Sequence, residues 1–318
     1  MPQQTVLVTG ASGFVGAALV VRLWCRTDVS VTAASRNMNH LWPVGVKYLN
    51  LADFEADHIV IPLDGIDTII HCAARVHVMS EQALDPFLEF RKVNVHATLS
   101  LARQAAAAGV RRFIFISSIK VNGETTVAGG SFYPSDVPAP EDPYAISKLE
   151  AERGLMQLAH ETGMEVVVIR PPMVYGPGVK GNFASLIKLI AKGLPLPLGA
   201  IHNKRSLVAI DNLVDLIIRC IDHPAAANQV FLAGDGEDLS TAELVSSVAE
   251  AMGRSVRLIP VPVSLLSLAA TLLGKQEVAR RLLGSLQVDI SKTREVLGWE
   301  PPVSVKEGLR RCVRDPSV

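Results

Sequence analysis

The sequence predicts a doubly wound α/β fold, in which helices cover both faces of a parallel sheet. Short apolar runs such as TVLVT and RFIFISS alternate with segments of helical pattern, a rhythm typical of βαβ units. A glycine-rich segment stands between the first apolar run and the first helical pattern, where such folds turn from strand to helix. With 318 residues, 49% of them hydrophobic and 19% charged, the chain can bury a large core.

Five apolar runs are expected to be neighbouring strands of one sheet. They are TVLVT, VSVTAAS, DTIIHCAA, RFIFISS and EVVVIR. Runs this rich in valine, isoleucine and phenylalanine indicate strands that are buried on both faces. The helical patterns between them run from about Phe14 to Arg26, through an alanine-rich segment before Gly109, and from Tyr144 to about Glu161.

The pattern changes after Arg170 to segments rich in proline and glycine, PPMVYGPG and GLPLPLG. This change predicts that the chain leaves the sheet there. We expect the later runs SLVAI and QVFLAG to return to it. The first domain would then hold residues 1–173 and about 207–235, and a smaller mixed α/β lobe that binds substrate would hold about 174–206 and 236–318.

The overall charge gives no broad attraction to polyanions, so any anionic ligand must meet local charges. Lys plus Arg and Asp plus Glu number 31 each, so there is no net field to attract nucleic acid or an anionic membrane. The four cysteines form neither a C-x-x-C pair nor a disulfide framework, and no secretion signal opens the sequence, so we expect a cytoplasmic protein. The apolar stretch Val263 to Leu273 is too short to span a bilayer and is expected to be a buried helix of the second lobe, with a peripheral membrane contact as the alternative.

The glycine-rich segment has the form G-x-x-G-x-x-G, with Gly10, Gly13 and Gly16 at its marked positions. In such a loop the first glycine makes a tight turn, the second lets the backbone approach a pyrophosphate, and the third allows close helix packing. The phosphates lie at the positive amino terminus of the helix. The loop therefore predicts a dinucleotide site, to which Ser12, Phe14 and Val15 also belong.

The end of the second predicted strand reads Ala34-Ser35-Arg36. An acidic residue there would accept hydrogen bonds from a ribose 2′-hydroxyl, whereas an arginine beside a small hydroxyl suits a 2′-phosphate. No Asp or Glu occurs between Val29 and Asn50. This composition predicts a preference for NADP(H), with NAD(H) possible. The alternative is that Arg36 is a solvated loop charge.

Tyr144 and Lys148 are four residues apart at the start of a predicted helix, which places both side chains on one face. The ammonium is expected to lower the phenol pKa, whose ordinary value is about 10. Ser118 ends the run RFIFISS, at the carboxyl end of its strand. A serine there could bond a carbonyl or alcohol oxygen while Tyr144 transfers the proton and a nicotinamide transfers hydride.

The segments TGASGFVG, HCAA, FISS, PYAISK, RPPMVYGPG and DISKTREVLGWEPP together resemble the extended short-chain dehydrogenases, a Rossmann-fold family that includes nucleotide-sugar epimerases, dehydratases and ketoreductases. The resemblance implies a catalytic triad of Ser118, Tyr144 and Lys148, with Lys148 also bonding the nicotinamide ribose. It implies a homodimer as well. The further cofactor contacts that it implies are Ala73, Ala74, Asn94, Pro171 and Val174.

The resemblance also implies a substrate site for a UDP-sugar. Asn182 and Arg205 resemble positions that grip the nucleotide diphosphate, and an arginine offers the paired donors that a diphosphate accepts. Arg280 or Arg281 could add a second contact. The eight histidines show no spacing typical of metal ligands, so no catalytic metal is expected.

Three functions are open at this point. The segments HCAARVHVM and SSIKVNGE, together with Ser35-Arg36, resemble the UDP-4-keto-6-deoxy-hexosamine 4-reductases of bacterial surface polysaccharide (O-antigen) synthesis, so NADPH-dependent reduction of the C4 ketone ranks first. An NAD-dependent UDP-hexose 4-epimerase is the alternative. A non-catalytic dinucleotide-sensing protein is a third. Asn122 departs from the aromatic residue that sugar epimerases often have after the catalytic serine.

Overall fold

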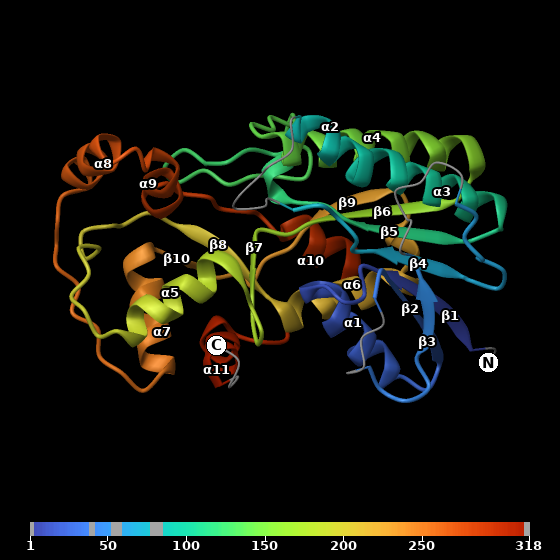
Figure 1. Cartoon of the computed structure of the whole chain (residues 1–318), viewed down its shortest axis with the longest axis horizontal. Coiled ribbons are helices and arrows are strands. Elements are labelled where there is room, and N and C mark those ends of the chain that lie inside the picture. Colours follow the sequence, from blue (N-terminus) through green and yellow to red (C-terminus); the bar gives the residue numbers. More distant parts are fainter. Residues whose placement is uncertain (1–2, 38–41, 52–58, 77–84, 315–318) are drawn as a thin grey trace.

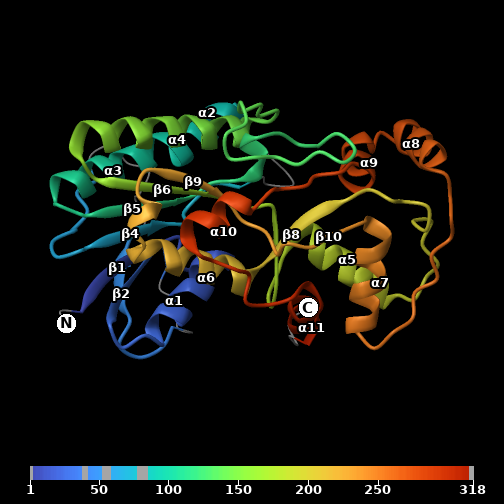
Figure 2. The same ribbon diagram turned by 180° about the vertical axis from the view of Figure 1, so that it is seen from behind.

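The computed structural model describes residues 3–37, 42–51, 59–76 and 85–314. A large parallel sheet with helices on both faces lies at one end of the molecule (Figure 1), and a small sheet with its own helices lies at the other. Seen from behind in Figure 2, the segments that join the two ends pass beside β7 and α10.

The large sheet has seven strands in the order β3-β2-β1-β4-β5-β6-β9, and all neighbours are parallel. This order confirms the predicted doubly wound class, because it reverses direction after β1. The strands are β1 (Gln4–Thr9), β2 (Val29–Ser35), β3 (Lys47–Asn50), β4 (Thr68–His71), β5 (Arg112–Ile116), β6 (Glu165–Arg170) and β9 (Gln229–Leu232).

Two helical layers cover the sheet, and the alternation of side chains along each strand assigns residues to one layer or the other. Val6 and Val8 of β1 pack with α1 (Phe14–Trp24) and α6 (Ile210–Asp222). Leu7 points the opposite way, into the cluster that holds α3 (Thr98–Ala107) and α4 (Pro143–Thr162). The sequence before α3 forms α2 (Pro86–Arg91) and a π-helical segment, η1 (Lys92–Ala97).

The small sheet consists of β7 (Met173–Tyr175), β8 (Arg205–Ala209) and β10 (Asp238–Leu239). It packs with α5 (Gly181–Ala191), α7 (Thr241–Ala251) and α11 (Val305–Arg314) around a separate apolar cluster. The expectation that SLVAI returns to the large sheet is therefore wrong, and only QVFL does so. β8 pairs in parallel with β7 instead, with Val174 opposite Val208.

The remaining elements are short. They are η2 (Ile119–Val121), η3 (Pro224–Ala226), α8 (Val263–Leu272), α9 (Gln276–Leu283) and α10 (Ser291–Leu297). No side chain of α8 is buried, so the prediction of a buried helix there is wrong. Among the helices that the structure describes, none has the length and hydropathy that crossing a bilayer requires.

Candidate active site

The glycine loop forms a cradle that larger residues cannot make. Gly10 has a φ of +64°, and a Cβ placed on it would lie 2.6 Å from the backbone nitrogen of Ala73. A Cβ on Gly16 would collide with the carbonyl oxygen of Gly10, and the Gly13 N–H donates to that same oxygen over 2.9 Å. Because α1 begins directly after Gly13, its unpaired N–H groups face the loop, as an anion-binding site requires.

A cavity of about 380 Å³ opens above this loop, at the carboxyl ends of β1, β2 and β4. Seven of the predicted cofactor residues line it: Gly10, Ser12, Gly13, Ser35, Arg36, Ala73 and Ala74. The lining also includes residues that sequence reasoning missed: Ala34, Leu51, Cys72, Arg75, Val76 and Val93. Cys72 lies within the HCAA motif and Arg75 follows it directly, so the motif and one further residue would have found both.

Ser35 is held in place from several sides. Its hydroxyl donates to the carbonyl oxygen of Asn37 over 2.5 Å, and its own carbonyl accepts from Leu51 N (3.0 Å) and from the Tyr48 hydroxyl (3.2 Å). Only 5% of Ser35 is exposed. The side chain of Arg36, in contrast, is exposed at the rim of the cavity. The Ser35 hydroxyl proton is therefore already used in a hydrogen bond within the protein. Of the pair Ser35 and Arg36, Arg36 is the residue that faces solvent.

The three predicted catalytic residues meet at the carboxyl end of β5. Asp142 caps α4 by accepting from Ala145 N over 2.7 Å, which places Tyr144 in the first turn. Ser118 caps η2 and shares a hydrogen bond with the Tyr144 phenol. One turn further along α4, Lys148 is 2% exposed and donates to the carbonyl oxygen of Ile116 over 2.8 Å.

The protonation of this trio differs from the expectation. Burial, reinforced by the nearby Asp142 carboxylate, raises the pKa of Tyr144 to about 12, against the opposing hydrogen bond from Ser118. Burial lowers the pKa of Lys148 to about 8. The ammonium does not offset the burial of the phenol, because it is directed at the Ile116 carbonyl and lies 4.4 Å from the centroid of the Phe115 ring. The phenol therefore holds its proton at neutral pH in this structure.

Asn94 connects the wall of the cavity to α4. Its Nδ2 donates to the Arg75 carbonyl and to Ser147 Oγ, each over 3.0 Å, and its Oδ1 accepts from Arg75 N over 2.8 Å. The residue is 1% exposed and lies in the π-helical segment η1, an irregularity often found at functional sites. The structure thus places Asn94 behind the cavity, where it positions the chain around Arg75 and Ser147.

A buried ion pair lies directly behind Ser118. Arg170, at the end of β6, donates to both carboxylate oxygens of Glu152 on α4, over 3.0 and 2.5 Å. It also donates to Asn122 Oδ1 over 2.9 Å, and the Ser117 hydroxyl donates to Glu152. Asn122 is 2% exposed, so the residue that departs from the epimerase pattern serves this network. No spacing in the sequence indicates such a pair, because its partners come from different elements.

The predicted substrate residues lie on the side of the small sheet. Arg205 begins β8, is half-buried and donates to the Gly284 carbonyl over 3.0 Å, and burial lowers the pKa of its guanidinium. Asn182 is exposed in the first turn of α5. Arg280 pairs with Glu141 (2.6 Å) and Glu124 (3.3 Å), which leaves little of its charge for a ligand.

Pro171 and Val174 follow β6, at the same edge of the large sheet. The Pro171 carbonyl accepts from Ile119 N over 3.0 Å, so this predicted contact lies beside the segment that carries Ser118. Val174 belongs to β7 and packs against the apolar cluster that includes α1. Phe14 and Val15 are partly buried in the first turn of α1.

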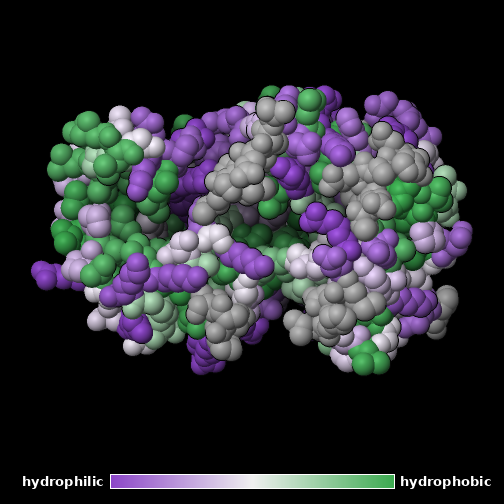
Figure 3. Space-filling view, viewed as in Figure 1, coloured by the Kyte–Doolittle hydropathy of each residue, from purple (hydrophilic) through white to green (hydrophobic). Residues whose placement is uncertain are grey.

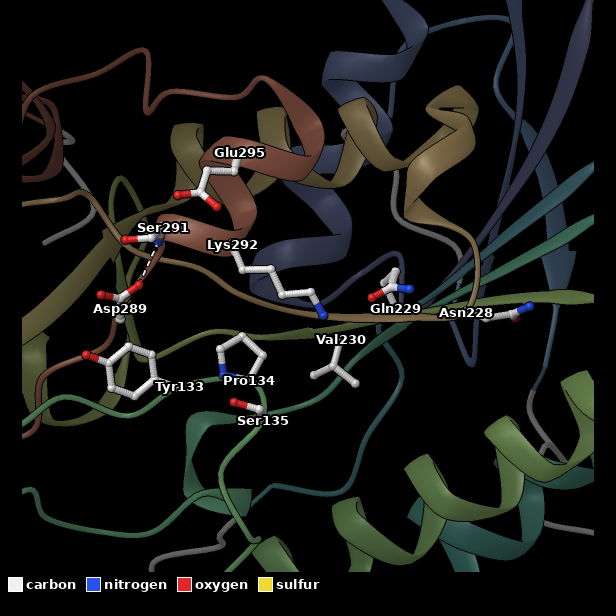
Figure 4. A pocket seen from close by; sticks show the side chains of 10 residues that line it. All are labelled: Tyr133, Pro134, Ser135, Asn228, Gln229, Val230, Asp289, Ser291, Lys292 and Glu295. Atoms are coloured by element: carbon white, nitrogen blue, oxygen red, sulfur yellow. Dashed lines mark hydrogen bonds between the residues drawn. The ribbon is translucent and has the colours of Figure 1, made fainter.

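A second cavity, of about 390 Å³, lies between α10, the outer strand β9 and the loop around Tyr133 (Figure 4). Lys292 reaches across its middle, with Asp289 and Glu295 on the same side. None of the predicted catalytic, cofactor or substrate residues lines it. It is therefore separate from the site at the glycine loop.

Comparison with known proteins places these features in context. Residues 6–234 match the model of the NAD dependent epimerase/dehydratase family. A UDP-glucose 4-epimerase of Vibrio cholerae is 51% identical over 99% of this chain and 95% of its own length. A GDP-6-deoxy-D-mannose reductase of Pseudomonas aeruginosa is 28% identical over 98% of this chain and 97% of its own. The crystal structure of a Thermotoga maritima UDP-glucose 4-epimerase with UDP-glucose has a TM-score of 0.75 and 24% identity, covering 98% of each chain.

The prediction ranked first from sequence, an NADPH-dependent 4-ketoreductase for a UDP-linked 4-keto-6-deoxy-hexosamine, is wrong. The 51% identical relative is an epimerase that the chain matches over nearly its whole length, and this favours the alternative, a UDP-hexose 4-epimerase. The reductase ranking depended on the resemblance of HCAARVHVM and SSIKVNGE to such reductases and on Ser35 and Arg36 as a phosphate site. In the structure, the Ser35 hydroxyl is already bonded to the Asn37 carbonyl.

Proposed function

Because the chain belongs to the NAD dependent epimerase/dehydratase family, we propose that it interconverts the C4 epimers of a UDP-hexose. The observation that carries the proposal is the match to a UDP-glucose 4-epimerase, at 51% identity over 99% of this chain. The site supports it, because Ser118, Tyr144 and Lys148 meet at the end of the large sheet beside the glycine-loop cavity.

The protein residues fit a nicotinamide dinucleotide. Cβ atoms at Gly10 and Gly16 would collide with the backbone of Ala73 and of Gly10, so only glycines allow the tight loop that leaves the N–H groups at the start of α1 open to a pyrophosphate. Ala73 and Ala74, with short side chains, line the same cavity. When bound, the oxidised dinucleotide supplies a hydride acceptor for C4 and a positive charge that favours the phenolate form of a nearby tyrosine.

In this reaction Tyr144 would take the proton of the sugar 4-hydroxyl as C4 is oxidised to the ketone, and it would return the proton as the ketone is reduced from its opposite face. Ser118, which bonds the phenol, would also hold the substrate oxygen. Lys148 holds its amino group at the Ile116 carbonyl and, by resemblance to the family, would bond the nicotinamide ribose. Arg205 is the candidate contact to the substrate diphosphate.

The choice of cofactor follows from the same reaction. An epimerase recovers its hydride in each cycle, so it needs no NADPH supply, and we assign NAD⁺ as the cofactor. The competing prediction is the NADP(H) preference drawn from Ser35 and Arg36. The bond from the Ser35 hydroxyl to the Asn37 carbonyl supports NAD⁺, since it removes one of the two donors that a 2′-phosphate would use. The homodimer and the cytoplasmic location stay predictions.

The decisive experiment incubates the purified full chain with UDP-galactose and catalytic NAD⁺, and in parallel with NADP⁺. Proton NMR of the sugar anomeric region should show UDP-glucose formation at constant cofactor absorbance at 340 nm. A parallel reaction contains UDP-4-keto-6-deoxy-GlcNAc and NADPH. Net NADPH consumption without epimerisation would contradict the proposal. Dinucleotide binding without either reaction would favour a non-catalytic sensor.

A further inference from the structure

Helix α8 presents apolar side chains to solvent instead of to the protein. Leu265, Leu268 and Leu272 are 55%, 57% and 79% exposed. They follow the spacing i, i+3, i+7, so they lie on one face of the helix. Leu266 and Ala270, on the opposite face, are the partly covered ones. The exposed stripe is therefore the outward face of the helix.

The apolar surface extends beyond the helix itself. Ile259, Val263, Leu273 and Val278 are each at least 40% exposed, and they belong to the same stretch of chain. Figure 3 shows a hydrophobic patch at the end of the molecule where Figure 1 places α8. Exposed apolar patches of this kind mark sites of interaction with another surface.

The charges around the patch indicate the chemistry of that surface. Residues 258–274 contain no Asp, Glu, Lys or Arg. Exposed cations stand at both ends of this run, Arg254 and Arg257 before it and Lys275 after it. The next acids along the chain are Glu250 before it and Glu277 after it, and they pair with Lys306 (2.9 Å) and Arg281 (3.9 Å). Buried apolar area and nearby cations both strengthen the binding of a surface helix to an anionic membrane.

A second protein chain fits this patch less well. Stable protein interfaces use about 20–30 residues a side. The stretch from Ile259 to Val278 offers seven exposed large apolar residues on little more than one short helix. A bilayer needs no matching shape, and it can accept a few leucines at the depth of its headgroups.

We propose that α8 docks the protein on an anionic lipid bilayer, with Leu265, Leu268 and Leu272 inserted among the headgroups and Lys275 and Arg257 against lipid phosphates. The docked helix is tied to the candidate substrate site. Helix α9 follows α8 in the chain, and Gly284 is the first residue after α9. The Gly284 carbonyl accepts from Asn203 over 2.8 Å and from Arg205 over 3.0 Å. This inference does not depend on the proposed reaction.

Flotation of the full-length protein with vesicles tests the proposal. Vesicles of phosphatidylcholine with about one third phosphatidylglycerol should carry the protein up a density gradient at 50 mM salt, and pure phosphatidylcholine vesicles should carry much less. Leu265→Ser/Leu268→Ser/Leu272→Ser should lower the partition coefficient at least about tenfold. Lys275→Gln should lower it about fivefold, the equivalent of one cation near the surface.

The matched control replaces three exposed valines elsewhere, Val44→Ser/Val60→Ser/Val137→Ser, and should float like the unaltered protein. Circular dichroism and turnover in solution should be equal for all variants, which separates docking from folding. The proposal is overturned if the unaltered protein does not float with anionic vesicles, or if the leucine variant floats equally well. It is also overturned if the leucine variant only converts a dimer to a monomer in light scattering, since the patch would then belong to a second copy.

Discussion

Lys148 Nζ donates to the carbonyl oxygen of Ile116 over 2.8 Å, which ties the second turn of α4 to the last residue of β5. This bond sets the distance between the helix that carries Tyr144 and the strand end that leads to Ser118. The ammonium is buried, and burial lowers its pKa to about 8.

Replacement of Tyr144 by phenylalanine removes the proton carrier and leaves the ring that packs near Phe90. We expect kcat for UDP-galactose epimerisation to fall by about 10³-fold, with the NAD⁺ dissociation constant changed less than threefold. Calorimetry and the NMR assay measure the two quantities. Tyr133→Phe, at a half-exposed tyrosine of a surface loop, is the control and should keep full activity. An active Tyr144→Phe enzyme would exclude the assigned role.

Arg205→Ala tests the candidate contact to the substrate diphosphate. The loss of one charge-assisted pair should raise KM for UDP-galactose about 10–100-fold and lower kcat less. Steady-state kinetics gives both values, and UDP alone as a competitive inhibitor should weaken in parallel. Lys188→Ala removes an exposed cation of α5 as the control. If KM is unchanged while kcat falls, Arg205 acts on the structure around Gly284 and not on the diphosphate.

Gly16→Ala should weaken dinucleotide binding, because the added Cβ collides with the Gly10 carbonyl oxygen and forces α1 away from the loop. We expect the dissociation constant of NAD⁺ to rise at least about tenfold, which equals 1.4 kcal/mol. Fluorescence titration with NADH measures it. Ala17→Gly, in the same helix turn, lowers helix propensity by about 1 kcal/mol without adding an atom. Equal losses in both variants would mean that helix stability, and not the collision, controls binding.

The buried pair of Glu152 and Arg170 predicts a large effect on stability. Arg170→Met leaves the Glu152 carboxylate buried without its partner, so the free energy of unfolding should fall by about 3–5 kcal/mol. Glu152→Leu together with Arg170→Met should recover much of that loss. Arg311→Met, which breaks exposed pairs with Asp211 and Glu307, should cost about 1 kcal/mol or less. Urea denaturation distinguishes these cases, and equal costs for Arg170 and Arg311 would refute the prediction.

His71 makes the stability depend on pH. The ring is fully buried between the hydroxyls of Thr9 (2.7 Å) and Thr98 (2.9 Å), and burial, reinforced by Lys148, lowers the pKa of His71 to about 3. The unfolded chain takes up this proton near pH 6.5, so stability falls as pH drops from about 6.5 towards 3, by about 1.4 kcal/mol per unit.

Between pH 7.5 and 5.0, the unaltered protein should therefore lose about 2 kcal/mol more of unfolding free energy than His71→Gln does. Urea denaturation at both pH values gives the difference. His160→Gln, at an exposed histidine of α4, should behave like the unaltered protein. An equal loss in the unaltered protein and in His71→Gln would show that this ring does not contribute.

By itself, the sequence determined the class of the sheet, the glycine cradle and the three catalytic candidates. These features depend on local chemistry: apolar runs separated by helical periods, glycines that alone fit a crowded turn, and side chains one helical turn apart. The tertiary structure decided how the elements pair and what surrounds each side chain. The run SLVAI joins the small sheet, Glu152 meets Arg170, and the Tyr144 pKa rises because burial outweighs the lysine four residues on.

The same division applies to two other expectations, of which the cofactor preference stays a prediction and the buried position of α8 is wrong. Ser35 and Arg36 have the composition of a phosphate site, but the Ser35 hydroxyl turns to the Asn37 carbonyl, a contact set by the backbone after β2. Helix α8 has the composition of a buried helix, but no other element covers its outward face. Hydrogen-bond partners and solvent exposure depend on which segments meet in space, and the order of residues along the chain does not specify that.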